Sequence, residues 1–150
     1  MLMTLWEHLR SVWTLKSKLL DENDYLYLDA EGNPTVKSRA AYRRIKKAGW
    51  RKLASAFGLC FLILGKERQT CRDEKGEYFI WTYRVKVIDP RSGRFAEAEG
   101  SCSSRDSLLQ SKGKVNESDV IHKAQSAAVS RGIADLLGLE AVEAVKEGAR

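Results

Sequence analysis

Residues 82–101 read TYRVKVIDPRSGRFAEAEGS, and this stretch decides the fold. Apolar and polar residues alternate on both sides of PRSG, as they do in two antiparallel strands joined by a tight turn. If Asp89 pairs with Arg94, alanines lie opposite valines on one face and opposite charges meet on the other. The expected pairs are Val87 with Ala96, Val85 with Ala98, Lys86 with Glu97 and Arg84 with Glu99.

A further strand precedes this hairpin. Cys60–Thr70 and Tyr78–Ile88 are both rich in β-branched and aromatic residues, and the turn-forming sequence RDEKGE separates them. Residues 60–101 therefore predict a three-stranded antiparallel meander. A helical pattern follows at 119–137, and its small residues suit close packing on a sheet. The expected fold class is α+β, with the meander packed against helices as a β-β-β-α core.

The remaining elements complete one expected domain over residues 1–150. Thr4 and Glu7 form a capping-box pattern in front of an amphipathic helix, whose two tryptophans can be core residues or can contact a neighbouring subunit. Apolar residues three and four apart after Ser38 indicate a second helix that ends at Gly58. The expected segments are an N-terminal helix at 1–20, a basic helix at 38–58, the meander at 60–101, a polar loop at 102–118, a helix at 119–137 and a tail helix at 139–147.

Positive charge is concentrated on the expected helix at 38–58. Between Gly32 and Lys66 the chain has nine Lys or Arg residues and no Asp or Glu. The alternatives are a solvated helix face and a nuclear localisation signal, but a solvated face usually has acids one turn away to neutralise its cations. The segment favours a polyanionic partner such as nucleic acid. The expected contact residues are Arg39, Arg43, Arg44, Lys46, Lys47, Trp50 and Arg51.

The aromatic residues of the sequence indicate that the nucleic acid is single-stranded. Bases of any sequence stack on aromatic rings, and each such contact is worth roughly 1–3 kcal/mol. Trp50, Trp81 and Tyr83 are the candidates for stacking, and burial in the core is the competing fate of each. The sequence therefore favours single-stranded nucleic acid as the ligand.

No catalytic motif is evident. The sequence has no GxxxxGK[ST] loop, no GxSxG elbow and no HExxH motif, so we do not expect an enzyme, a cofactor or a resident metal. Asp89, Glu97 and Glu99 leave a metal-dependent nuclease as an alternative, because hairpin carboxylates can hold Mg²⁺. The lysine expected two residues after the second acid is missing from this pattern, because Ser101 follows Glu99.

Cysteine usage and hydropathy indicate the compartment. Three cysteines without a CxxC pair and two distant histidines argue against a zinc site and a disulfide scaffold. The longest apolar run, around Leu59–Leu64, is shorter than the roughly 18 residues of a membrane span. No signal peptide is evident. The expected location is the cytoplasm, that of the host if the protein is viral, without a membrane partner.

Four segments together resemble a known family. They are AGWRKLASAFGL at Ala48–Leu59, the strand TYRVKVIDPRSGR, EGSCSSRD at Glu99–Asp106 and HKAQSAAVSRGIADLLGL at His122–Leu139. These segments are similar to phage and archaeal single-strand annealing proteins, in the superfamily typified by the recombination mediator Rad-fifty-two and the mitochondrial genome maintenance annealing protein. The resemblance covers residues 34–139, most of the chain.

The resemblance implies protomers that assemble side by side into rings or arcs and hold single-stranded DNA in a continuous basic groove. It implies annealing of complementary strands in homologous recombination and DNA repair, without ATP or metal. Longer members carry a C-terminal extension that recruits a recombinase, so annealing rather than recombinase loading is expected here. By position, the resemblance implies the groove residues Arg43, Lys47, Arg51, Lys52, Lys86, Arg105, Lys123 and Arg131.

Three other functions remain open. A single-stranded DNA or RNA-binding protein of replication or transcription would bind strands without pairing them. A metal-dependent nuclease would cleave them, and a structural oligomer would not bind them. The leading expectation is a homo-oligomeric annealing protein whose partners are single-stranded DNA and further copies of itself.

Overall fold

The computed structural model describes residues 4–145, and within them the chain is a mixed α+β protein with two three-stranded antiparallel sheets and four α-helices. The chain forms two compact units where the sequence favoured a single domain. Among the described residues, the first unit consists of 4–58 together with 137–145, and the second is Leu59–Leu136. Each unit contains one of the two sheets and its own buried residues.

The larger sheet lies in the second unit. Its strands β3 (Cys60–Asp73), β4 (Gly76–Ile88) and β5 (Phe95–Ser103) pair antiparallel in the order β3-β4-β5. The four cross-strand pairs expected between β4 and β5 are all observed. The turn between these strands closes where Asp89 N–H donates to the carbonyl of Arg94 at 2.8 Å. Alternation of apolar and charged residues was therefore sufficient to predict this register.

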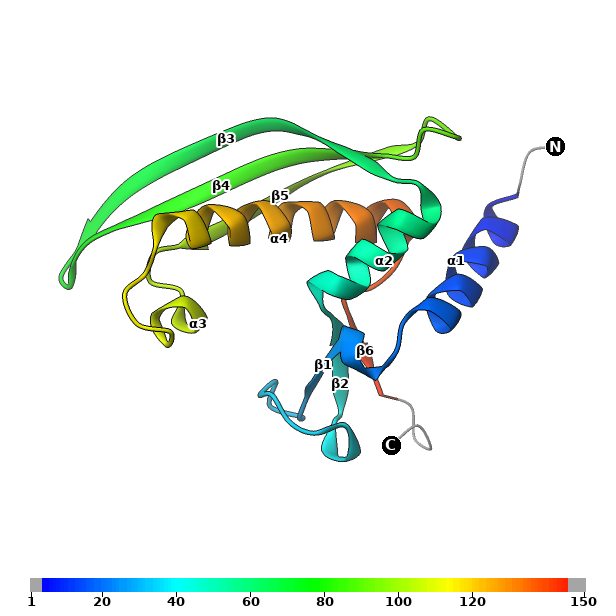
Figure 1. Ribbon diagram of the computed structural model, residues 1–150, viewed down its shortest axis with the longest axis horizontal. Helices are drawn as coiled ribbons and strands as arrows, with labels where there is room; N and C mark the ends of the chain where they lie inside the picture. Colours follow the sequence, from blue (N-terminus) through cyan, green and yellow to red (C-terminus); the bar gives the residue numbers. More distant parts are fainter. Residues whose placement is uncertain (1–3, 146–150) are drawn as a thin grey trace. The chain divides into compact units, whose positions relative to one another are not determined.

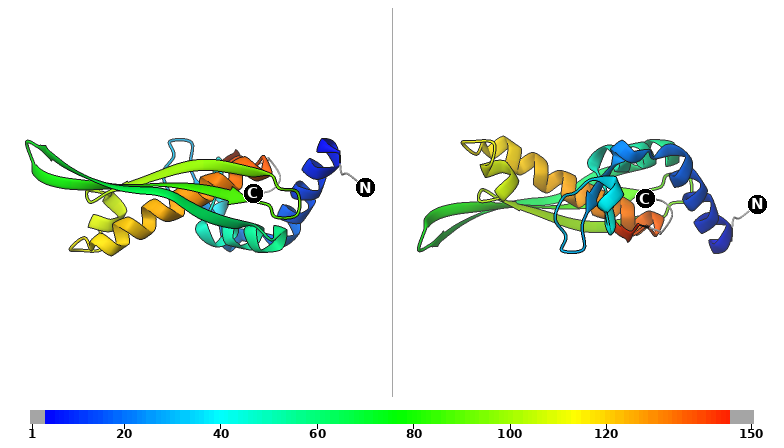
Figure 2. Two further views of the ribbon diagram at one scale, coloured as in Figure 1. Left: turned by 90° about the horizontal axis from the view of Figure 1, so that it is seen from above. Right: turned by 90° about the horizontal axis from the view of Figure 1, so that it is seen from below.

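Helix α4 (Glu117–Leu137) crosses one face of the larger sheet (Figures 1 and 2). Val85 and Val87 on that face are 0% and 1% exposed. Gly100 of β5 lies directly against the helix backbone, since a Cβ placed on it would be 2.3 Å from the nitrogen of Ala128 and 2.7 Å from the carbonyl oxygen of Ala124. The small residues of α4 thus allow helix and strand backbones to touch.

Replacing Gly100 with alanine will destabilise the second unit. The added methyl group meets backbone atoms that cannot rotate away, so we expect a loss at or above the upper end of the roughly 1–3 kcal/mol typical of overpacking. Gly65→Ala is the matched control, because Gly65 lies in the same sheet with open space around it and a negative φ. Urea unfolding measures both changes, and equal midpoints for the two variants would contradict the close approach.

The smaller sheet lies in the first unit, where β1 (Tyr25–Leu28), β2 (Tyr42–Ile45) and β6 (Val142–Ala144) pair antiparallel in the order β1-β2-β6. Helix α1 (Leu5–Leu19) begins with the expected capping box between Thr4 and Glu7. The other elements are the 3-10 turns η1 (Glu22–Asp24) and η2 (Lys37–Arg39), the helix α2 (Lys47–Phe57), and in the second unit the short helix α3 (Ser107–Gln110).

The helix expected at 38–58 is wrong in its first half. Residues 42–45 form β2, which hydrogen-bonds to β1 on one side and to β6 on the other, and α2 begins only at Lys47. Tyr42 and Ile45 fit a helical spacing, but a central strand satisfies its backbone groups on both edges, and such tertiary pairing overrides local propensity. Gly58 ends α2 as expected, with φ 66°.

The C-terminal expectation is also wrong. In place of a tail helix at 139–147, residues 142–144 form β6, while residues 146 and 147 lie outside the described part. The pairing of β6 with β2, set by a strand 100 residues earlier, is not visible in local spacing. The polar segment at 102–118 contains the end of β5, all of α3 and the start of α4.

Among the described residues, no helix has the length and apolar content needed to cross a membrane.

Candidate nucleic-acid interface

The expected contact residues divide between the two units. Those in the first unit are Arg39, Arg43, Arg44, Lys46, Lys47, Trp50, Arg51 and Lys52, and those in the second are Lys86, Arg105, Lys123 and Arg131. The first group comes from η2, β2 and α2 rather than from one helix. Their side chains therefore do not form the single helical stripe that the sequence predicted.

We call four exposed cations of the first unit uncompensated because they form no side-chain ion pair or hydrogen bond in the described chain, although Lys46 lies near enough to Asp24 to help lower the pKa of that carboxyl. Arg39, Arg44, Lys46 and Arg51 all face solvent, and within the described residues none of their side chains takes part in an ion pair or hydrogen bond. Arg51 stands close enough to Lys47 that burial and this neighbouring positive charge together lower the pKa of Lys47. Like charges are held close together here, which raises the affinity of the surface for anions.

Two other cations of the first unit are already engaged. Lys52 Nζ lies 2.7 Å from Asp24 Oδ2, and Asp24 is 3% exposed. Burial disfavours ionisation of Asp24, but the hydrogen bond from Lys52 and others outweigh it and hold the pKa of this carboxyl below its usual value. Arg43 is paired with Glu143. Both side chains therefore form ion pairs within the first unit, and their contact with a strand stays a prediction.

The cations of the second unit also have intrachain partners. Arg105 pairs with Asp73 and donates to the Gly76 carbonyl at 3.1 Å, which fastens it to the β3–β4 turn. Lys123 Nζ lies 2.7 Å from Asp106. The remaining contacts are Lys86 Nζ at 4.0 Å from the Phe95 ring centroid and Arg131 Nη1 at 2.9 Å from the Glu99 carbonyl oxygen.

The aromatic candidates do not supply stacking platforms. Trp50 and Tyr83 are each 4% exposed, so the prediction that Trp50 contacts nucleic acid is wrong for the folded protein. Trp50 precedes Leu53 by three residues, which places both on the buried face of α2. Trp81 is half-buried, and its indole N–H donates to Glu117 at 3.0 Å. On α1, Trp13 is 51% exposed, whereas the Trp6 side chain lies outside the described part.

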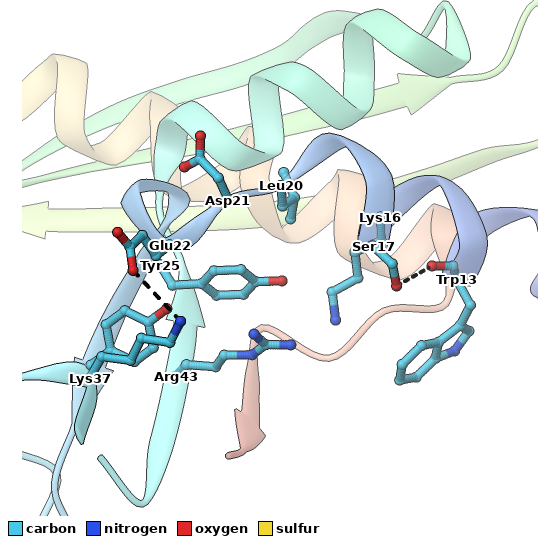
Figure 3. Close-up of a pocket in the computed structure, with 10 residues that line it drawn as sticks. Trp13, Lys16, Ser17, Leu20, Asp21, Glu22, Tyr25, Lys37 and Arg43 are labelled. Atoms are coloured by element: carbon cyan, nitrogen blue, oxygen red, sulfur yellow. Dashed lines mark hydrogen bonds and ion pairs between the residues drawn. The ribbon is translucent and has the colours of Figure 1, made fainter. Parts of the chain in front are cut away.

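A pocket of about 330 Å³ lies in the first unit between α1, β1 and β2 (Figure 3). It combines aromatic rings with cations. Tyr25 and Tyr27 project from the same face of β1, and the Arg43 guanidinium lies 4.1 Å from the centroid of the Tyr25 ring. The residues that shape it include Trp13, Lys16, Tyr25, Tyr27, Lys37 and Arg43.

Glu143 holds one wall of this pocket in place. Its carboxylate binds the Lys16 ammonium at 2.8 Å and the Nε of Arg43 at 2.5 Å. Burial alone would raise the pKa of Glu143, but the two cations outweigh it, so the pKa is lowered. One carboxylate thus joins β6 to α1 and to β2. Sequence reasoning missed the site because these residues lie up to 127 positions apart.

The Asp89, Glu97 and Glu99 pattern has structural uses. The Asp89 carboxylate accepts hydrogen bonds from Arg91 N–H at 3.1 Å and Ser92 Oγ at 3.0 Å, which shapes the β4–β5 turn. Glu97 and Glu99 lie opposite the cations of β4. In the residues that could be searched, no group of three or more His, Cys, Asp or Glu side chains is placed to hold a metal ion.

No protein-family model matches the sequence, and no curated protein matches it either.

Replacing Glu143 with glutamine will destabilise the first unit in a pH-dependent way. The folded-state pKa of Glu143 lies below its ordinary value of 4.5, so its stabilisation is complete above pH 4.5 and is lost as the pH falls through the lower, folded value. At pH 7 the variant leaves Lys16, only 3% exposed, without its counter-charge. We expect a loss of about 2–4 kcal/mol, slightly below the range for fully buried pairs because Glu143 retains some exposure.

Urea unfolding between pH 7 and pH 3 measures this effect. The difference between wild type and Glu143→Gln should shrink as the solution is acidified, while the exposed neighbour substitution Glu140→Gln should have little effect at any pH. A difference that is constant with pH would show that the carboxylate charge is not what stabilises this wall.

Proposed function

We propose that this protein binds single-stranded DNA and anneals complementary strands as a homo-oligomer, in recombination or repair and without ATP or a metal. The observation that carries the proposal is the acid-free segment of the first unit, in which Arg39, Arg44, Lys46 and Arg51 are exposed and lack side-chain partners in the described chain. Elsewhere most of the expected cations are paired within the protein. Uncompensated cations favour phosphate backbones and require no particular sequence.

The resemblance to single-strand annealing proteins points the same way. Its implied β-β-β-α order is supported by the sequence of elements β3, β4, β5 and α4, with the short α3 between the last two. Annealing needs a surface that grips the backbone and leaves base edges available to a second strand. A cationic surface with its tryptophan buried, as Trp50 is, suits that requirement better than a row of stacking rings would.

The decisive experiment is an annealing assay. The rate at which two labelled complementary oligonucleotides pair is measured with and without the protein, without ATP and with EDTA to silence any nuclease. We expect acceleration that is lost at high salt. Binding without acceleration would instead indicate a protective single-strand binder, and absence of binding would reject the proposal.

Removing the uncompensated cations should weaken binding and its salt dependence together. For Arg44→Ala, Lys46→Ala and Arg51→Ala combined, the slope of log K against log salt should flatten by up to about 2, because each phosphate contact on a single strand contributes roughly 0.7. The control is a variant in which three exposed lysines of the second unit, Lys75, Lys112 and Lys114, are all replaced by alanine. It loses the same amount of positive charge. If both triple variants lose the same slope, net charge rather than this surface governs binding.

Self-association is supported by β3, which lies at the edge of the larger sheet in the described part of the chain. This edge strand is 14 residues long, and its apolar run Phe61–Leu64 is exposed, with Leu62 at 55% and Ile63 at 48%. An edge strand presents unpaired backbone groups that can pair with another chain, and exposed apolar side chains strengthen such pairing. A row of weak phosphate contacts repeated along an assembly then gives strong binding.

Placing a charge on this edge should reduce the assembly. Leu62→Glu is compatible with the folded protomer, because Leu62 lies opposite Lys86, but it opposes burial against another copy. Gln69→Glu adds the same charge on the same face of β3, away from the apolar run. Light scattering should show a smaller mass for Leu62→Glu alone, and an unchanged mass would exclude this edge as the interface.

A further inference from the structure

The pocket between α1, β1 and β2 contains the hydroxyl of Tyr25, a residue that is almost fully buried. Tyr25 is 6% exposed, and within the described residues its hydroxyl makes no hydrogen bond. Figure 3 shows this hydroxyl directed into the pocket, on the side where Lys16 approaches from α1. A polar group buried without a hydrogen bond is costly, so an occupant that donates or accepts one is favoured here.

The charges around the pocket do not select for a phosphate group. Lys16 and Arg43 share the carboxylate of Glu143, and Lys37 lies 3.6 Å from Glu22. The cations at the pocket are therefore largely neutralised by neighbouring acids. An uncharged occupant gives up less hydration on entering than an anion does, and it meets no excess of either charge.

The chemistry of the walls suits a flat ring. Trp13, which is half exposed, and the tyrosines of β1 bring π surfaces to the walls. Lys16 Nζ already lies 4.9 Å from the centroid of the Trp13 ring, and the Arg43 guanidinium is stacked on Tyr25, so an occupant would use the remaining ring surface. Lys16 has three ammonium donors and one hydrogen-bond partner, Glu143, in the described chain. The walls are thus rich in donors. A planar, neutral group with carbonyl acceptors meets these requirements, and among the components of DNA this is a nucleobase such as thymine.

We propose that this pocket receives one unpaired, carbonyl-bearing nucleobase of the bound strand. The inference rests on the proposed function, since it specifies which part of a single strand the first unit recognises. The uncompensated cations bind backbone phosphates, whereas the pocket binds a base edge. One base in each protomer is held in this way, and the pocket leaves the other bases of the strand free to pair.

Thymidine, which has no phosphate, tests the pocket directly. Isothermal calorimetry of the full chain should show saturable binding of thymidine, weaker binding of deoxyadenosine, whose base has no carbonyl group, and no gain in affinity for thymidine monophosphate. Tyr25→Phe should weaken thymidine binding about 2- to 10-fold, the effect of one hydrogen bond. Trp13→Ala should weaken it about 5-fold or more through lost stacking.

A matched control is available in the same sheet. Tyr42 is 41% exposed and projects from the opposite face of β2 from Arg43, so Tyr42→Phe should bind thymidine as the wild type does. Equal thermal midpoints for the two tyrosine variants exclude misfolding as the cause of any difference. Absence of thymidine binding, or equal affinities for wild type and Tyr25→Phe, would overturn the proposal.

A measurement of single-stranded DNA binding distinguishes failure of the nucleobase pocket from failure of the annealing function. Fluorescence anisotropy with a labelled oligothymidylate is measured for wild type and Tyr25→Phe under the same conditions. Thymidine binding that depends on Tyr25, without any strand binding, would reject the strand-annealing function and retain a nucleoside pocket. Strand binding without thymidine binding would reject the pocket and leave the cationic surface as the binding site.

Discussion

The carboxylate of Glu143 is the constraint on which the first unit depends. It lies on β6, and it binds one cation from α1 and one from β2. Without it, Lys16 would be a buried charge with no counter-charge, and such a charge is several kcal/mol less stable than a paired one. The same contact fixes the position of the pocket, because both cations also line it. The same ion pairs of Glu143 therefore stabilise the first unit and position the residues of the candidate site.

The protein uses its positive charge in two ways. Lys52, Arg105 and Lys123 are bound to carboxylates, so they maintain the fold. Arg39, Arg44, Lys46 and Arg51 have no such partner in the described chain, and they lie close together in sequence within a segment that contains no acids. A count of basic residues does not distinguish the two groups. The presence or absence of an ion-pair partner does. The distinction explains why net charge by itself is a poor guide to where a polyanion binds.

Sequence reasoning succeeded where the pattern was local. The register between β4 and β5 follows from alternation on either side of one turn, and α4 from its period and its terminal glycine. It failed at β2 and β6, because those strands are specified by partners far along the chain. The error at β2 also misplaced Trp50, whose exposure depends on where α2 begins. The pocket lining lies within residues 13–43, but the pocket was missed because residues 42–45 were expected to be helical and because Glu143, which binds Lys16 and Arg43, comes from far along the chain.

The placement of β6 has a consequence for synthesis on the ribosome. Every strand and helix of the larger sheet's unit comes from one continuous stretch, so that unit can acquire its contacts while the chain is still growing. The first unit cannot, because β2 lacks one neighbour and Lys16 lacks its acid until residues 142–144 emerge. Until then the sheet that contains β1 and β2 is incomplete, so α1 and β1, although translated before the second unit, reach their final contacts after it can fold.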